Sequence, residues 1–164
     1  MFGRSGDTPP MPSWYRDPEA PVPNQPTRIG AIALIERDGA LLVERRMDDR
    51  SWALIGGAVE ADESVVEALI REVREETGLS TRSVELFGVF SDPTRIVGYE
   101  DGNVYRVLAI VFGVDVDDGL PDASEESREV RFVACRELLA LDLTPAHRPI
   151  VERYLARPEQ VVVE

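Results

Sequence analysis

The chain has 164 residues, 43% of them hydrophobic, and a formal net charge of −13 at pH 7. This length favours one domain with a sizeable core, and the hydrophobic content excludes a disordered chain. The acidic balance argues against nucleic acid or an anionic membrane as a partner, whereas bound cations can balance the charge of a small nucleotide. With one cysteine, no signal pattern and no apolar run of membrane-spanning length, we expect a cytoplasmic protein.

Prolines dominate residues 1–27, which hold seven of the twelve in the chain. Such a segment excludes a helix or a central strand, so we predict a proline-rich N-terminal arm. Trp14 and Tyr15 are its exception, because a large aromatic pair usually packs on something. We expect them to lie against the domain or across a dimer partner. The domain itself is predicted over residues 28–158, followed by a short C-terminal tail at 159–164.

Residues 28–46 predict a hairpin, because Asp38-Gly39 is a strong two-residue turn signal between two apolar runs. A short strand is expected over residues 51–55, with Trp52 in the core. It leads into Gly56 and Gly57, where the backbone is free to turn tightly.

A helix is predicted after this glycine pair. Ser64 and Glu67 match a capping box at its start, and Gly78 is a good residue for its end. One face is apolar, through Val65, Val66, Leu69 and Val73. The helix therefore has one face suited to the core.

The other face of this helix carries three carboxylates. Glu72, Glu75 and Glu76 fall at i, i+3 and i+4, so they share one side and repel one another. At an effective dielectric near 20, two such charges about 5 Å apart repel by about 3 kcal/mol. Mg²⁺ and Mn²⁺ reverse this cost because they prefer carboxylate oxygens. The pattern therefore indicates a metal site.

The rest of the chain alternates strands with short helices. Strands are predicted over residues 84–90, 104–116 and 129–134, a loop or hairpin tip over 97–103, and helices over 138–141 and 146–156. Residues 104–116 form the longest apolar run and are the best candidate for a central strand. The pattern predicts an α/β or α+β sandwich, with helices flanking a mixed sheet.

The stretch from Gly57 to Leu79 resembles the Nudix box, G-x5-E-x7-R-E-U-x-E-E-x-G-U, where U is a bulky aliphatic residue. Every fixed position is filled, by Gly57, Glu63, Arg71, Glu72, Val73, Glu75, Glu76, Gly78 and Leu79. The resemblance implies a Nudix-type α/β/α sandwich with a mixed central sheet. It also implies hydrolysis of a pyrophosphate bond in a nucleoside diphosphate linked to another moiety, with Mg²⁺ or Mn²⁺. Ile55 departs from the family, where a proline often precedes the two glycines.

Carried over by position, Glu72, Glu75 and Glu76 are implied metal ligands, and either Glu72 or Glu76 is implied to accept a proton. Arg71 is implied to position these glutamates through ion pairs. Glu63 and Gly57 are implied to support the site.

Residues outside the box complete the predicted site. Many Nudix enzymes use a further acid, for which Glu125, Glu126 and Glu129 are candidates, and we favour Glu129 as a catalytic residue. Arg45, Arg46, Arg95 and Arg106 are candidates to meet substrate phosphate, and Arg46 and Arg95 are preferred. Taken alone, each is expected to be an ordinary surface arginine. The one histidine, His147, is expected to be surface structure rather than a base.

Two functions from different classes fit the motif. The first is a metal-dependent pyrophosphohydrolase of ADP-ribose or a related sugar nucleotide, with oxidised nucleotides and dinucleoside polyphosphates also open. The second is a nucleotide-sensing module of the same fold without turnover, which the retained glutamates disfavour. Expected partners are a small-molecule nucleotide and a second copy in a homodimer, with no nucleic acid and no membrane.

Overall fold

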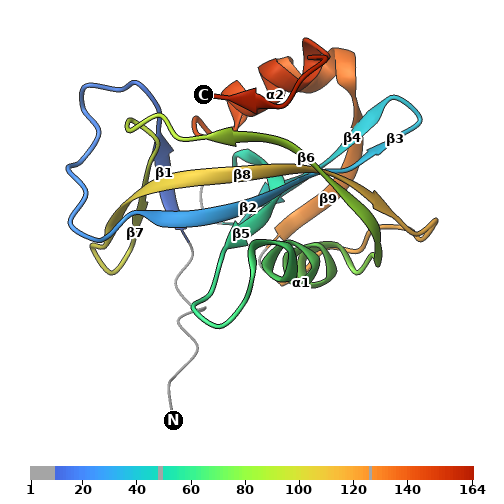
Figure 1. The fold of residues 1–164 in the computed structure, drawn as a ribbon, viewed down its shortest axis with the longest axis horizontal. Helices are drawn as coiled ribbons and strands as arrows, with labels where there is room; N and C mark the ends of the chain where they lie inside the picture. The colour runs from blue at the N-terminus through green and yellow to red at the C-terminus, as the bar shows by residue number, and fades with distance from the viewer. Residues whose placement is uncertain (1–9, 48–49, 126) are drawn as a thin grey trace.

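A mixed sheet lies between two helical layers in the computed structural model, which describes residues 10–47, 50–125 and 127–164. Helix α1 (Val65–Thr77) covers one face, and helix α2 (Arg148–Leu155) lies over the other (Figure 1). The 3-10 helix η1 (Cys135–Ala140) packs on the α2 side through Leu138. The predicted α/β/α sandwich is confirmed. In the described part of the chain, no helix has the length and hydropathy needed to cross a membrane.

Strand β8 (Val104–Val116) is the centre of the sheet, as predicted from its long apolar run. It runs parallel to β2 (Arg28–Leu34), in a register that joins Ala31 to Ile110. It is antiparallel to both β6 (Thr81–Phe90) and β7 (Ile96–Tyr99). Parallel and antiparallel pairs therefore meet in one sheet.

The predicted hairpin is also present. Strand β3 (Glu36–Arg37) pairs with β4 (Ala40–Arg46) around Asp38 and Gly39, both of which have positive φ. Strand β9 (Ser127–Ala134) then pairs with β4. Strand β5 (Trp52–Ala58) pairs with β4 through its first half and with β2 through its second half. This change of partner brings the glycine pair of β5 alongside β2.

The chain ends of the described region add two short edge strands. Strand β1 (Pro10–Trp14) pairs with β7, and β10 (Val162–Val163) runs parallel to β6. Prolines are tolerated at a sheet edge, so this placement agrees with the exclusion of a central strand. Tyr15 donates to Glu164 at 3.4 Å, which confirms that this aromatic residue packs on the domain. Residues 97–99, part of the expected loop or hairpin tip, belong to strand β7 because β1 and β8 supply partners.

Alternating side chains of β2 divide the core in two. Ala31, Ala33 and Ile35 pack with Leu69 and Val73 of α1. On the opposite face, Ile32 and Leu34 pack with Trp52, Ile150 and Tyr154, which belong to β5 and α2. Trp52 is buried, which confirms its predicted core role. Both faces of the sheet are therefore covered, and α1 is held firmly against β5 and β2.

Candidate active site

Helix α1 begins and ends where its sequence predicts. The Ser64 hydroxyl accepts the Glu67 amide at 3.2 Å, while the Glu67 carboxylate accepts the Ser64 amide at 2.8 Å. Gly78 ends the helix in the left-handed conformation, with φ of 72°. Leu69 and Val73 are buried beneath the helix. These contacts fix the rotation of α1, and with it the direction of its acidic face, which we define as Glu72, Glu75 and Glu76.

Arg71 is the hub of an ion-pair network beside this acidic face. It binds Glu63 through two contacts, of 2.6 and 3.0 Å, and also contacts Glu72 at 2.6 Å and Glu75 at 3.3 Å. A further hydrogen bond reaches the carbonyl of Ala58 at 3.2 Å. The hydrogen bond between Arg71 and Glu63 lowers the pKa of Glu63. That bond and the one to Glu72 raise the pKa of Arg71. Arg71 and Glu63 thus lie where a positioning role requires them.

The glycine pair of β5 contacts two of the three carboxylates. A Cβ on Gly57 would lie 2.6 Å from the carboxyl carbon of Glu72, so only glycine leaves room for that carboxylate. The amide of Gly56 donates to Glu76 Oε2 at 2.8 Å. Gly56 has φ of 146°, and its Cβ would lie 2.9 Å from the backbone of Ile32. The missing side chain of Gly57 therefore leaves the space in which Glu72 lies, and the Gly56 amide holds Glu76.

The donor set fits a hard divalent cation in its chemistry, because all three side chains offer carboxylate oxygens. In the conformation described, Glu72 and Glu75 turn toward Arg71, and Glu76 turns toward Gly56. Within residues 10–47, 50–125 and 127–164, no three acidic, histidine or cysteine side chains are gathered closely enough to hold a metal ion. The Glu75 side chain is 61% exposed, so rotating it toward a cation breaks only a surface ion pair.

Glu129 does not join the acidic face of α1. Its neighbours Val130 and Phe132 pack in the α1-side core, so the alternation of β9 directs Glu129 to the other face. There it forms an ion pair with Arg131 at 2.9 Å. Glu129 therefore lies apart from the acidic face of α1, and its role as the further acid stays a prediction. Glu125 is exposed, and Glu126 lies outside the described residues.

Glu44 is an acid that the sequence analysis missed. It is 8% exposed and lies opposite Ala53 in the β4–β5 register, with Leu42 two residues earlier in the α1-side core. Its carboxylate accepts a hydrogen bond from the Ser127 hydroxyl, at the start of β9. The sequence signal that could have identified Glu44 is a glutamate at an inward-facing position of an otherwise apolar strand.

Arg95 and His147 are not the surface residues that the sequence suggested. Arg95 is only 2% exposed and donates to the carbonyl of Ala146. His147 Nδ1 accepts the amide of Leu54 at 3.0 Å. Burial, with smaller contributions from Arg95 and Arg46, lowers the pKa of His147 to about 3. The two preferred arginines therefore share one neighbour, a neutral histidine that the sequence gave no reason to select.

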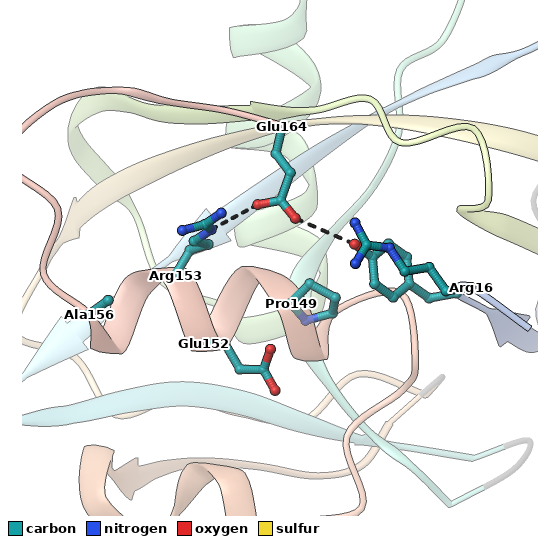
Figure 2. Close-up of a pocket in the computed structure, with 7 residues that line it drawn as sticks. Arg16, Pro149, Glu152, Arg153, Ala156 and Glu164 are labelled. Carbon is teal, nitrogen blue, oxygen red and sulfur yellow. Dashed lines mark hydrogen bonds and ion pairs between the residues drawn. The ribbon is translucent and has the colours of Figure 1, made fainter.

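A cavity of about 310 Å³ lies elsewhere, over α2 (Figure 2). Tyr15 and Arg16 of the N-terminal arm meet α2 and Glu164 there, and Arg153 binds the Glu164 carboxylate at 2.8 Å. None of the box glutamates lines it. Arg16 forms an ion pair with Asp92, and Arg153 forms one with Glu164. The cavity therefore lies where the arm, α2 and residue 164 meet.

Known proteins are similar to this chain in sequence. A family model described as the NUDIX domain matches residues 25–154. The ADP-ribose pyrophosphatase of Methanocaldococcus jannaschii is 36% identical over 132 residues, which cover 77% of this chain and 72% of that protein. The nucleoside triphosphatase NudI of Escherichia coli is 37% identical over 123 residues, covering 70% of this chain and 87% of that one.

A solved structure gives the same result for the fold. The solution structure of the Escherichia coli ORF135 protein superposes with a TM-score of 0.65 at 29% identity, over 86% of this chain and 100% of that one. The similarity thus extends well beyond the stretch from Gly57 to Leu79.

Proposed function

Because the chain belongs to the Nudix family, we propose that the acidic face of α1 holds Mg²⁺ or Mn²⁺ against a nucleotide pyrophosphate. The protein is a Nudix pyrophosphohydrolase, and Nudix hydrolases generally depend on divalent metal ions. In this proposal Glu72, Glu75 and Glu76 are the metal ligands. The metal supplies charge neutralisation and a lowered pKa for bound water.

The chain's own residues organise the reaction around the pyrophosphate. Arg71 holds Glu72 and Glu75 in place, and Glu63 in turn holds Arg71. Glu72 or Glu76 accepts the proton of the attacking water, which breaks a phosphoric anhydride bond and releases two phosphorylated products. No covalent intermediate is required, so the lack of a serine or cysteine nucleophile in the motif is accounted for.

The space beside Gly57 is the observation that carries this proposal. If the acidic face of α1 were merely solvated, the Glu72 side chain would turn to water. A glycine that leaves room for its carboxylate would then have no structural purpose. The Glu72 side chain is 14% exposed and is held by Arg71 at 2.6 Å, so its placement is built into the fold. A carboxylate fixed beside two others at helical spacing is suited to a cation.

A panel of nucleotides tests the proposal directly. ADP-ribose, other sugar nucleotides, nucleoside triphosphates, oxidised nucleotides and dinucleoside polyphosphates are incubated with the protein and Mg²⁺ or Mn²⁺, and products are separated by anion-exchange chromatography. We expect cleavage of at least one class at a phosphoric anhydride and none after chelation with EDTA. Binding without turnover across the whole panel would instead support the nucleotide-sensing module.

The relatives narrow the first substrates to try. One is named an ADP-ribose pyrophosphatase and the other a nucleoside triphosphatase. The sequence identity of the chain is 36% to the first and 37% to the second. ADP-ribose and the nucleoside triphosphates therefore come first. The cytoplasmic location and the homodimer stay predictions, the second of which sedimentation equilibrium tests.

A further inference from the structure

Strand β9 has one edge that is paired with β4 and one edge that is not. Within the described residues, β4 is the only strand that pairs with β9. The Leu42 amide of β4 donates to the Ile35 carbonyl at 2.8 Å, and the Arg46 amide donates to the Ser51 carbonyl at 2.9 Å. Even-numbered residues of β4 therefore direct their backbone groups away from β9, and the odd-numbered residues bond to it.

The backbone groups of Val130 and Phe132 point to the free edge of β9. These two residues lie opposite Glu44 and Leu42 in the register, which are even-numbered residues of β4. In the part of the chain that the structure describes, no backbone group bonds to the amide or carbonyl of Val130 or Phe132. Such a row of unpaired backbone groups is a template for one more strand.

The charges of β9 select one antiparallel register with a second copy of the strand. Because Val130 bonds outward, it can face its own copy, Arg128 or Phe132 of the second copy. When Val130 faces its own copy, Glu129 faces Arg131 of the second copy, and Arg131 faces Glu129. When Val130 faces Arg128, Glu129 faces Glu129. When Val130 faces Phe132, Arg131 faces Arg131. Like charges directly opposite are unfavourable, so only the first register is complementary.

Glu129 and Arg131 are accessible for this exchange of partners. They form an ion pair with each other at 2.9 Å, and their side chains are 44% and 51% exposed. An exposed ion pair of this kind contributes little to stability, so replacing it with a pair between two copies costs little. In a chain with a net charge of −13, β9 carries two arginines and one glutamate. Two copies therefore repel each other less at β9 than at an acidic surface.

We propose that β9 pairs antiparallel with β9 of a second copy of this chain, with Val130 opposite Val130, and that this edge is the interface of a homodimer. Charged residues on an edge strand ordinarily oppose association, but here their spacing opposes the neighbouring registers and permits this one. The two sheets join into one, and both α1 helices lie on the same side of it. The edge is short, so we expect a dissociation constant in the micromolar range.

Charge reversal tests the register, with sedimentation equilibrium as the measurement. Arg131→Glu places glutamates opposite one another, and Glu129→Arg places arginines opposite one another. Each variant alone should therefore raise the dissociation constant of the dimer by at least about tenfold. Mixed in equal amounts, the two variants restore both opposite-charge pairs and should form a heterodimer. Arg136→Glu is the matched control, because it makes the same charge change on an 83% exposed side chain of η1.

The heterodimer also separates a lost interface from a damaged fold. The Arg131 guanidinium carbon lies 4.9 Å from the centre of the Trp52 ring, so Arg131→Glu also changes a contact within one copy. Thermal unfolding shows whether each variant is folded. A wild type that stays monomeric at millimolar concentration would overturn the proposal. A dimer that survives Arg131→Glu, or folded variants that form no heterodimer when mixed, would overturn it as well.

A disulfide tests the same register without any change of charge. In the proposed dimer the two Val130 Cα atoms lie about 5.5 Å apart, within the range that a disulfide spans. Val130→Cys is made together with Cys135→Ser, which removes the one native cysteine. Mild oxidation should give a covalent dimer on a non-reducing gel. Ala134→Cys in the same background is the control, because its copy lies far away along the strand.

Failure of Val130→Cys to crosslink, or equal crosslinking of Ala134→Cys, would show that β9 does not pair in this way. Neither the disulfide nor the charge reversal needs a substrate. The dimer interface is therefore tested separately from pyrophosphate hydrolysis.

Discussion

The two faces of the sheet differ in the partners that they offer to a charged side chain. On the α1 side, Arg71 forms ion pairs with three glutamates, at distances between 2.6 and 3.3 Å. On the α2 side, Arg95 is buried without a carboxylate in hydrogen-bond contact among the described residues, and instead packs against Phe90 and Tyr15. Burial lowers the pKa of both Arg95 and His147.

The comparison teaches how each side is encoded. The α1 network joins residues within one contiguous stretch, and a short motif can specify it completely. The α2 side brings Arg95 and His147 together from two distant segments, so no local pattern predicts it. The first side is suited to hold cations, whereas the second buries an arginine and a neutral histidine, and the following variants test that difference.

The largest effect is expected at Glu76. Glu76→Gln keeps an acceptor for the Gly56 amide but removes a carboxylate charge from the acidic face. We expect kcat to fall by about a thousandfold, or about 4 kcal/mol of transition-state stabilisation, with unchanged thermal unfolding. Initial rates of nucleotide cleavage give the result. Glu152→Gln, an exposed acid of α2, is the control. Full turnover by a folded Glu76→Gln protein would remove the catalytic role from the α1 side.

The glycine pair offers a sharper test of the same side. Gly57→Ala meets the end of the flexible Glu72 side chain, so we expect kcat/KM to fall by about 10- to 100-fold while the free energy of unfolding changes by less than about 1 kcal/mol. Gly56→Ala meets the backbone of β2 at positive φ, so it should destabilise the whole protein. Urea unfolding and steady-state kinetics of both variants separate the two. Equal losses of stability would mean that Gly57 serves packing alone.

On the α2 side, the neutral histidine predicts a dependence on pH. The folded pKa of His147, about 3, lies below its ordinary value of 6.5, so the unfolded chain binds the proton more tightly. The free energy of unfolding therefore falls as pH drops below 6.5. Between pH 7 and pH 4.5, wild type should lose about 2–3 kcal/mol more than His147→Asn.

Glu63 on the α1 side provides the contrast for this measurement. Its pKa is lowered from 4.5, chiefly by the bond to Arg71, so its contribution is present above 4.5 and is lost only at more acidic pH. Urea unfolding across the pH range distinguishes the two windows. Parallel profiles for wild type and His147→Asn would show that the imidazole is not held neutral by the fold.

The smallest effect is expected at the start of α1. Ser64→Ala removes the hydroxyl that caps the Glu67 amide, which should cost about 1 kcal/mol of stability. Activity should persist, because the acidic face lies two turns further along the helix. Ser83→Ala, at an exposed position of β6, serves as the control for thermal unfolding. A stability loss no larger than that of the control would show that packing of Leu69 and Val73 alone positions the helix.

Local patterns predicted most of the fold. The Asp38-Gly39 turn, the capping box at Ser64 and the long apolar run of β8 each act over a few residues, and each element forms where its pattern placed it. Strand β7 was missed because a four-residue strand needs the pairing of β1, which lies far away in the sequence.

The candidate site shows the same difference between residues placed by local patterns and residues placed by tertiary contacts. Glycine spacing and helical periodicity placed Gly57, Arg71 and the acidic face correctly relative to one another. The position of Glu129 depended instead on the parity of β9 relative to its neighbours, which the register with β4 sets. The burial of Arg95 likewise depends on tertiary contacts with Ala146 and Tyr15. Propensity and spacing do not contain that information.

The anchoring of Glu164 has a practical consequence for anyone who wishes to attach this enzyme to a surface or a reporter. Its amide donates to the Val89 carbonyl at 2.9 Å, and its side chain is held by Tyr15 and Arg153. A linker fused after Glu164 would therefore leave the molecule beside α2, on the side of the sheet away from α1 (Figure 1). Immobilised in that orientation, the protein would keep α1 open to the bulk solution, as an electrode or bead-based assay requires.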